Sequence, residues 1–176
     1  MSALSHLWLV TFVTHNSRVS ERMLEYGVQR GEPLIFSPDE QALMLGKILE
    51  ACQRHNIKPV AANILPDHVH MILLADSLPV LKEQVRKIKG YSAYAFQRTQ
   101  NREPGHPTWA QKFHFDPIPD EQAFVKMLQY VQGNHLKHTD RWGDGLITTW
   151  EERLKPLLDV TCILVEAALS YRPAGE

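Results

Sequence analysis

The chain has 176 residues, of which 44% are hydrophobic and 22% are charged. This is the composition of an ordinary globular protein, and the length suits one domain with a full hydrophobic core. The formal net charge of −1 excludes nucleic-acid binding through a strongly basic overall charge. Any binding of nucleic acid must therefore rest on a local basic surface.

The sequence shows no sign of secretion or membrane insertion. Cys52 and Cys162 are its only cysteines, and each lies in an apolar, helix-like stretch, which argues against a disulfide framework or a zinc ribbon. The N-terminal residues have neither a basic segment nor an apolar signal-peptide core. No apolar run reaches the roughly eighteen residues of a membrane span. We therefore expect a reduced, cytoplasmic protein without a membrane partner.

The first third of the chain alternates between strand-like and helix-like segments. Residues 6–14 are rich in β-branched and aromatic residues, which predicts a strand, and residues 19–29 are compatible with a short helix. Ser37-Pro-Asp-Glu40 is typical of a helix start, with serine as the N-cap, proline in the first turn and glutamate three residues after the cap. Apolar residues at helical spacing extend this predicted helix to about His55.

The stretch from Asn63 to Leu74 is the centre of the predicted fold. Ile64, Leu65 and the apolar run from Met71 to Leu74 predict a buried strand around His68-Val-His70. Pro66-Asp67 marks the entry of this strand or a bulge in it. Residues 57–62 also predict strand, and the sequence leaves open whether residues 57–74 form two strands or one long bent strand.

The second half of the chain is mainly helical. The expected elements are a helix over 78–98 capped by Asp76 or Ser77, a strand over 109–118, a helix over 121–138 capped by Asp120, a capping box at Thr149-Trp-Glu-Glu152 and a last apolar helix over 159–170.

This order of elements predicts an α+β fold of the ferredoxin-like (RRM-like) type. We expect an antiparallel sheet of four to five strands with helices on one face, the other face being available for a ligand. The domain covers residues 1–142, and residues 143–176 are a C-terminal helical extension of the same compact unit.

His68 and His70 are candidate metal ligands. Side chains alternate along a strand, so both imidazoles project from one face, roughly 6 to 7 Å apart at the backbone. Two histidines on a strand are also compatible with polar residues on a solvated sheet face. The apolar flanks argue for burial, however, and buried imidazoles need polar or metal partners.

Tyr130 and Asn134 lie one helical turn apart beside the apolar stripe of the helix predicted over 121–138. A divalent cation held by two imidazoles and one oxygen ligand keeps open positions and polarises a phosphodiester oxygen. A tyrosine hydroxyl near that phosphorus is a nucleophile for covalent catalysis, and the Asn134 amide oxygen is placed to join the metal. Taken singly, each residue is compatible with an ordinary boundary position.

The helix predicted over 78–98 has a positive charge that the whole chain lacks. Tyr91 and Tyr94 are interleaved with its basic residues. The candidate nucleic-acid contacts are Lys82, Arg86, Lys87, Lys89, Tyr91 and Arg98. The alternative is a solvated helix face, which is the usual role of such a charge run.

Four sequence blocks in order resemble the HUH superfamily of single-tyrosine transposases, which includes insertion-sequence (IS200-like) and REP-associated tyrosine transposases. They cover about residues 6–140, which makes the resemblance more specific than a His-x-His motif alone. The blocks are Pro66-Asp-His-Val-His-Met-Ile-Leu73, the stretch 81–96 with Ile-Lys-Gly-Tyr-Ser-Ala93, Trp109-Ala-Gln-Lys-Phe-His-Phe-Asp116 and Tyr130-Val-Gln-Gly-Asn134.

The resemblance implies an endonuclease and transposase that cuts and rejoins single-stranded DNA, with recognition of a hairpin and a flanking tetranucleotide. Tyr130 would become linked to the 5′-phosphate, and His68, His70 and Asn134 would hold Mg²⁺ or Mn²⁺. The family also implies a homodimer in which the tyrosine serves its own or the partner's metal site.

The chain also departs from this pattern. Many relatives have Asn-Pro where this sequence has Asn134-His135. His135 and His138 are candidates for additional metal or phosphate contacts, and the alternative, which is the more usual one, is a pair of solvated histidines at a helix end. One alternative function is a domesticated relative that binds DNA hairpins without cutting them. Another is a histidine-triad nucleotide hydrolase, which would need a third alternating histidine where this chain has Ile72.

Overall fold

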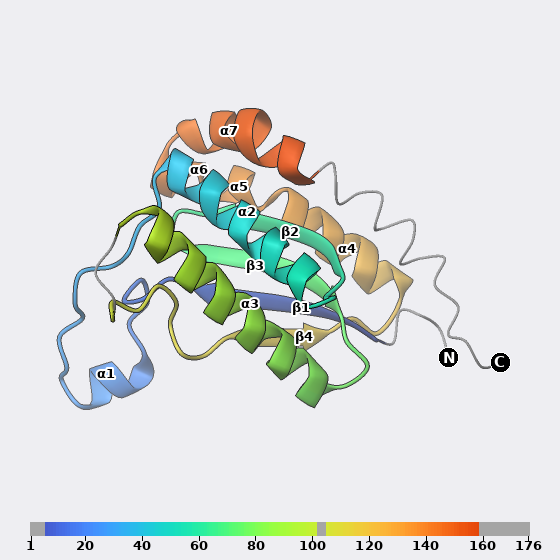
Figure 1. Cartoon of the computed structure of the whole chain (residues 1–176), viewed down its shortest axis with the longest axis horizontal. Coiled ribbons are helices and arrows are strands. Elements are labelled where there is room, and N and C mark those ends of the chain that lie inside the picture. The colour runs from blue at the N-terminus through green and yellow to red at the C-terminus, as the bar shows by residue number, and fades with distance from the viewer. Residues whose placement is uncertain (1–5, 102–104, 159–176) are drawn as a thin grey trace.

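The computed structural model describes residues 6–101 and 105–158. One antiparallel sheet has the strand order β2-β3-β1-β4, and long helices pack against it (Figure 1). This confirms the predicted α+β fold with a four-stranded antiparallel sheet. The strands are β1 (Leu7–Val13), β2 (Pro59–Leu65), β3 (His68–Leu74) and β4 (His114–Pro117), and the long helices are α2 (Pro38–Arg54), α3 (Leu78–Thr99) and α4 (Glu121–Gln132).

The central feature of the sheet is the hairpin of β2 and β3. Leu65 pairs with His68, so Pro66 and Asp67 are the two residues of a tight turn. Residues 57–74 therefore contain two strands and not one long bent strand. The prediction that Ile64 and Leu65 belong to the histidine strand was wrong, because both belong to β2. The physical reason is Pro66, which has no backbone N–H for a strand ladder and favours a turn.

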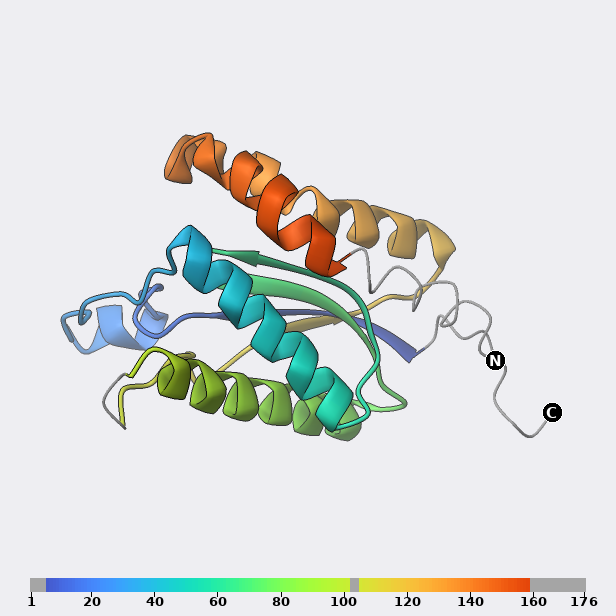
Figure 2. The same cartoon turned by 45° about the horizontal axis from the view of Figure 1, so that its top comes forward.

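The two faces of the sheet are covered by different helices (Figure 2). Val69, Met71 and Leu73 of β3 point into the larger core, which contains the apolar sides of α2 and α3. Residues on the opposite face contact α4, whose Phe124 and Val131 pack in a second apolar cluster with strand residues such as Ile72. The predicted arrangement with helices on one face therefore applies to α2 and α3, whereas α4 lies on the face that carries the histidines.

Three long helices begin at the predicted caps. Ser37 and Glu40 form the complete capping box of α2, Ser77 caps α3 and Asp120 caps α4. The helix predicted over 121–138 is instead divided at Gly133 into α4 and the short α5 (Asn134–Lys137). Glycine has a low helix propensity, which favours a break at this position.

Two further predicted elements are shorter in the structure. The helix expected within 19–29 is α1 (Glu21–Glu25). The strand expected over 109–118 is reduced to β4, and Trp109 makes only an isolated bridge to Thr14. The Trp109 indole donates a hydrogen bond to Ser92 Oγ at 3.1 Å and packs edge-on against Phe12 in the core.

The last part of the described chain forms α6 (Thr139–Trp142), α7 (Gly145–Thr149) and the π-helix η2 (Trp150–Leu154). The predicted capping box at Thr149 was wrong: the helical backbone continues through this residue, and its hydroxyl donates to the Gly145 carbonyl at 2.7 Å. Leu154 and Leu158 join the larger core. The helix predicted over 159–170 lies outside the described residues, and the domain boundary at residue 142 stays a prediction.

Within residues 6–101 and 105–158, no helix is both long enough and apolar enough to cross a membrane.

Replacing Ser37 with alanine should lower the free energy of unfolding by about 1 kcal/mol, because the Glu40 backbone N–H at the start of α2 loses its side-chain acceptor. Urea unfolding of the wild type and variant measures the difference. Ser37→Asn, which keeps a capping oxygen, should remain close to the wild type, and equal losses in both variants would contradict the capping role.

Candidate active site and metal centre

The two imidazoles predicted as metal ligands lie side by side on the face of β3 that α4 covers. His68 and His70 are only 3% and 4% exposed, and their ring centroids are 4.9 Å apart. His68 Nδ1 lies 2.6 Å from Asp67 Oδ1, and His70 Nδ1 lies 2.7 Å from Thr11 Oγ1. If each Nδ1 carries the proton in these contacts, each Nε2 keeps the lone pair that a metal ion requires.

Burial also keeps the His70 imidazole neutral. The pKa of His70 is lowered to about 3, first by burial and then by the neighbouring His68 and His138 side chains. A neutral imidazole is the form that coordinates metal, so His70 does not have to lose a proton at neutral pH to act as a ligand.

Asp67 is the charged anchor of the site. Its side chain is fully buried, and Oδ2 lies 2.9 Å from Arg18 Nη1 and 3.1 Å from Arg141 Nη2. Burial alone would raise the pKa of Asp67, but the hydrogen bond from His68 and the neighbouring positive charges outweigh it and lower the pKa. The turn residue is therefore an ionised carboxylate that orients His68.

Tyr130 reaches the imidazole pair from α4. Its hydroxyl lies 3.4 Å from His70 Nε2, and the two ring centroids are 5.0 Å apart. Asn63 of β2 fixes α4 over the sheet, because its Nδ2 donates a hydrogen bond to the Val131 carbonyl at 2.9 Å. Lys137 Nζ lies 4.5 Å from the centroid of the Tyr130 ring, so a positive charge borders the phenol.

Asn134 is fully buried one turn after Tyr130, and neither end of its amide has a hydrogen-bond partner in the part of the chain that the structure describes. A buried amide without partners costs free energy, and a bound metal ion would give its oxygen a partner. No group of three His, Cys, Asp or Glu in the described ranges is arranged to hold a metal ion. Two imidazoles with an amide oxygen nevertheless fit a hard divalent cation that keeps open positions.

The sequence of residues 34–134 matches the family described as "Transposase IS200 like". This match covers more than half of the chain and includes both imidazoles, the tyrosine and the asparagine. The chain belongs to the IS200-like transposase family.

One solved structure shares this fold, and a second shows a weaker similarity. A REP-associated tyrosine transposase described as bound to a REP hairpin has a TM-score of 0.50 and 17% identity, and the match covers 76% of this chain and 68% of that one. A putative transposase from Deinococcus radiodurans has a TM-score of 0.43 and 19% identity, over 72% of this chain and 88% of that one. No curated protein sequence matches the chain.

His135 and His138, the candidates for additional metal or phosphate contacts, have different positions. The His138 ring lies 5.2 Å from the His68 ring, at the border of the site. His135 turns away from it: its ring stacks on Trp150 at 4.4 Å, and its Nδ1 lies 3.4 Å from Asn63 Nδ2. His135 therefore connects α5 to the C-terminal π-helix.

The candidate DNA contacts on α3 are not brought to the imidazoles, because α3 covers the opposite face of the sheet. Lys82 is exposed. The other candidates have protein partners: Arg86 and Lys87 pair with Glu83, Lys89 donates to the carbonyls of Ala110 and Gln111, Tyr91 donates to Glu50, and Arg98 contacts the Tyr94 hydroxyl. Their role in DNA binding stays a prediction.

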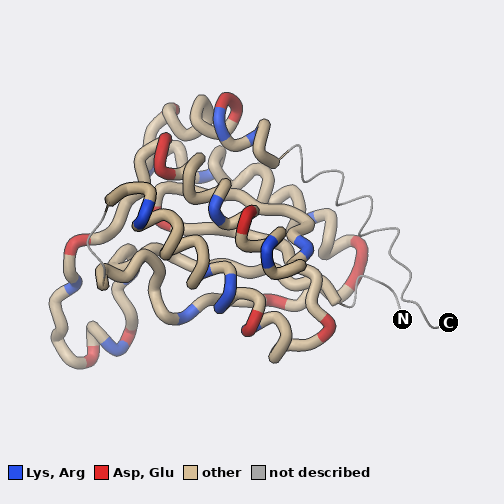
Figure 3. Tube along the Cα trace, in the orientation of Figure 1, with Lys and Arg blue, Asp and Glu red and all other residues tan. Residues whose placement is uncertain are grey.

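Basic residues that the sequence analysis did not select surround the imidazole pair instead. They are Arg18, which follows β1, and Lys137 and Arg141, which lie four residues apart on α5 and α6. Positive and negative residues are interspersed along the described trace, without a long stretch of one sign (Figure 3). Sequence periodicity carries no signal for this cluster, because only the fold brings Arg18 to Lys137 and Arg141.

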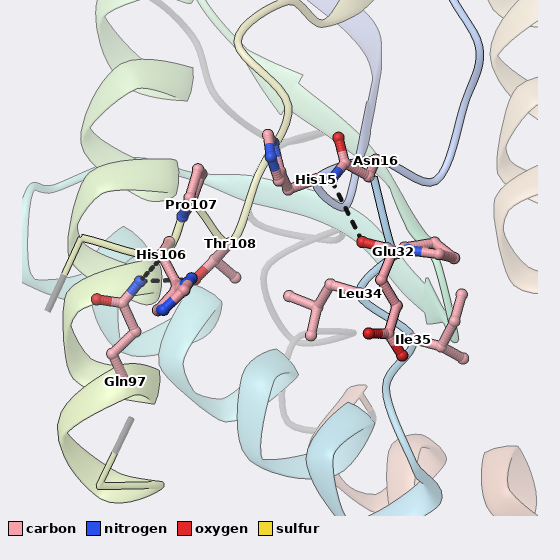
Figure 4. A pocket seen from close by; sticks show the side chains of 10 residues that line it. His15, Asn16, Glu32, Leu34, Ile35, Gln97, His106, Pro107 and Thr108 are labelled. Carbon is pink, nitrogen blue, oxygen red and sulfur yellow. Dashed lines mark hydrogen bonds between the residues drawn. The ribbon is translucent and has the colours of Figure 1, made fainter. Parts of the chain in front are cut away.

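A separate open cavity of about 940 Å³ lies where β1 ends (Figure 4). It is lined by side chains of His15, Asn16 and Leu34 on one side and by Gln97, His106 and Thr108 on the other. Gln97 Nε2 donates to the His106 carbonyl at 2.6 Å and lies 3.1 Å from Thr108 Oγ1. The imidazole pair and Tyr130 are not among its lining residues.

We expect the metal-free protein to lose about 2 kcal/mol of stability between pH 7 and pH 5 through His70 alone. The folded-state pKa of about 3 lies below the ordinary value of 6.5, so the unfolded chain binds the proton first as the pH falls. The stabilisation is complete above pH 6.5 and is lost progressively towards pH 3.

Urea unfolding with EDTA at both pH values, on the wild type and on His70→Asn, measures this effect. The variant should lose about 2 kcal/mol less than the wild type over this interval. An equal loss in the two proteins would show that the His70 pKa is not lowered.

Proposed function

We propose that this chain is an endonuclease and transposase that cuts and rejoins single-stranded DNA through a covalent 5′-phosphotyrosine. The observation that carries the proposal is the 3.4 Å approach of the Tyr130 hydroxyl to Nε2 of the buried His70. A nucleophile and a pair of metal-ligating groups that lie within reach of one phosphate are what phosphodiester transfer requires.

His68, His70 and Asn134 would hold Mg²⁺ or Mn²⁺, which supplies Lewis-acid polarisation of the scissile phosphate when bound. The chain's own residues do the rest. The Tyr130 hydroxyl oxygen forms a bond to phosphorus, while the bond from phosphorus to the 3′-oxygen breaks. The phenol loses its proton and the departing oxygen gains one, which leaves a free 3′-hydroxyl. Attack by such a hydroxyl on the phosphotyrosine reverses the step and rejoins DNA.

Two further features are part of the proposal. A structure with the same fold is described as bound to a REP hairpin, and we infer that this chain also recognises a hairpin beside the cleaved strand. We also propose a homodimer, as the family resemblance implies. Tyr130 and His70 are neighbours within one chain, which supports cleavage by a tyrosine that serves its own metal site.

The proposal requires that Tyr130→Phe abolish a covalent protein–DNA adduct. Wild-type protein incubated with Mn²⁺ and a labelled DNA hairpin with single-stranded flanks should give an adduct that survives denaturing electrophoresis. The variant should give none and still bind the hairpin. Hairpin binding without any adduct in the wild type would instead support the non-catalytic relative.

Asn134→Leu should weaken Mn²⁺ binding at least tenfold without destabilising the metal-free protein. Leucine has a similar shape and removes two buried polar atoms that have no partners in the described chain, so stability in EDTA should stay the same or rise. Loss of a metal ligand should lower the affinity.

Calorimetric titration with Mn²⁺ and urea unfolding in EDTA give the two readouts on the same samples. Leu136→Ala, an exposed neighbour on α5, is the matched control and should leave Mn²⁺ affinity unchanged. Unchanged Mn²⁺ affinity in Asn134→Leu would remove this residue from the metal site.

A further inference from the structure

Two arginines from distant parts of the chain converge on one buried carboxylate beside the imidazole pair. Arg18 follows β1 and Arg141 belongs to α6, and both contact Oδ2 of Asp67, at 2.9 and 3.1 Å. The other oxygen, Oδ1, lies 2.6 Å from His68 Nδ1. The Asp67 carboxylate therefore links both guanidinium groups to His68, a candidate metal ligand.

The charges in this cluster do not cancel. One guanidinium is enough to balance the Asp67 carboxylate, so the second leaves an excess positive charge. Lys137, against the Tyr130 ring, adds to this excess. Positive charge concentrated beside a site that handles phosphodiesters attracts the strand that is to be cut.

The exposure of the arginines indicates that neutralising Asp67 is not their whole role. The carboxylate is fully buried, but each arginine side chain is 45% exposed. A guanidinium has five N–H donors, and one nitrogen of each group makes the contact with Asp67. The remaining donors are enough for a bidentate contact with phosphate oxygens.

We propose that Arg18 and Arg141 form a phosphate-binding site for the DNA backbone next to the cleaved bond, with Asp67 as their fixed anchor. The identity of the ligand rests on the proposed function. Both arginines lie outside residues 34–134, the part of the chain that matches the family. The two arginines therefore come from the segments that flank the matched region, whereas their anchor Asp67 lies inside it.

The anchor explains how such a site would work. Long arginine side chains normally lose conformational freedom when they bind a ligand, which reduces affinity. Here each already contacts the buried carboxylate of Asp67, whose position is fixed by the turn between β2 and β3. The same carboxylate orients His68, so strand binding and metal binding share one rigid support.

The test is the salt dependence of DNA binding by the full chain in EDTA, where no cleavage intervenes. The probe is a labelled DNA hairpin with single-stranded flanks of randomised sequence. Removing one ionic interaction with a single-strand phosphate should reduce the slope of log affinity against log salt by about 0.7. We expect this change, and about tenfold weaker binding at low salt, in both Arg18→Gln and Arg141→Gln.

Arg22→Gln is the matched control, because Arg22 is an exposed arginine of α1 whose guanidinium lies over the Tyr26 ring. It should leave the slope unchanged. Arg18→Lys and Arg141→Lys keep the charge, so they should keep the slope, but they lose the forked donors of a bidentate phosphate contact and should bind DNA more weakly than the wild type. If a glutamine variant fails to fold, wild-type affinity in the lysine variants would overturn the proposal.

The results separate this site from the proposed function. Unchanged slopes in Arg18→Gln and Arg141→Gln, or an equal drop in Arg22→Gln, would overturn the phosphate site even if the wild type forms the tyrosine adduct. Reduced slopes limited to Arg18 and Arg141 would support it even if no adduct forms. Weaker Mn²⁺ binding with an unchanged slope would show that the arginines act only through Asp67 and His68, which also overturns it.

Discussion

The arrangement of the site depends on the buried carboxylate of Asp67. An ionised carboxylate without partners inside a protein is strongly unfavourable, so its position is determined by the groups that compensate it. Its two side-chain oxygens contact His68, Arg18 and Arg141, and its backbone carbonyl accepts from the Thr14 N–H at 2.9 Å. One turn residue thereby ties the end of β1, the start of β3 and α6 together around the first imidazole.

The second constraint is the position of α4 on the face of the sheet that carries the histidines. Apolar packing of Phe124 and Val131 holds this helix against the strands, and Asn63 adds a directional hydrogen bond to the Val131 carbonyl. Asn63 is also the cross-strand partner of His70. The position of Tyr130 relative to the imidazole pair is thus set by Asn63, which lies beside His70 in the sheet.

The local parts of the fold were predictable because their causes are local. Capping residues such as Ser37 and Asp120 mark where helices begin, and strand alternation alone places His68 and His70 on one face. The approach of Tyr130 to His70 was a hypothesis from residue chemistry and family resemblance, and the fold brings the two together. Arg18 and Arg141 could not be found in this way, since their proximity results from tertiary structure and neither belongs to a periodic pattern.

The four blocks that carry the family resemblance divide into two physical roles. The histidine and tyrosine blocks meet at the site, whereas the lysine–serine and tryptophan blocks meet on the other side of the sheet. There Ser92 Oγ accepts a hydrogen bond from the Trp109 indole, and Lys89 Nζ donates to the carbonyls of Ala110 and Gln111, the two residues after Trp109. These contacts bind α3 to the segment that leads into β4. A polar residue in a family motif can therefore be explained by core architecture, and here a basic side chain that resembled a DNA contact holds two segments of the fold together.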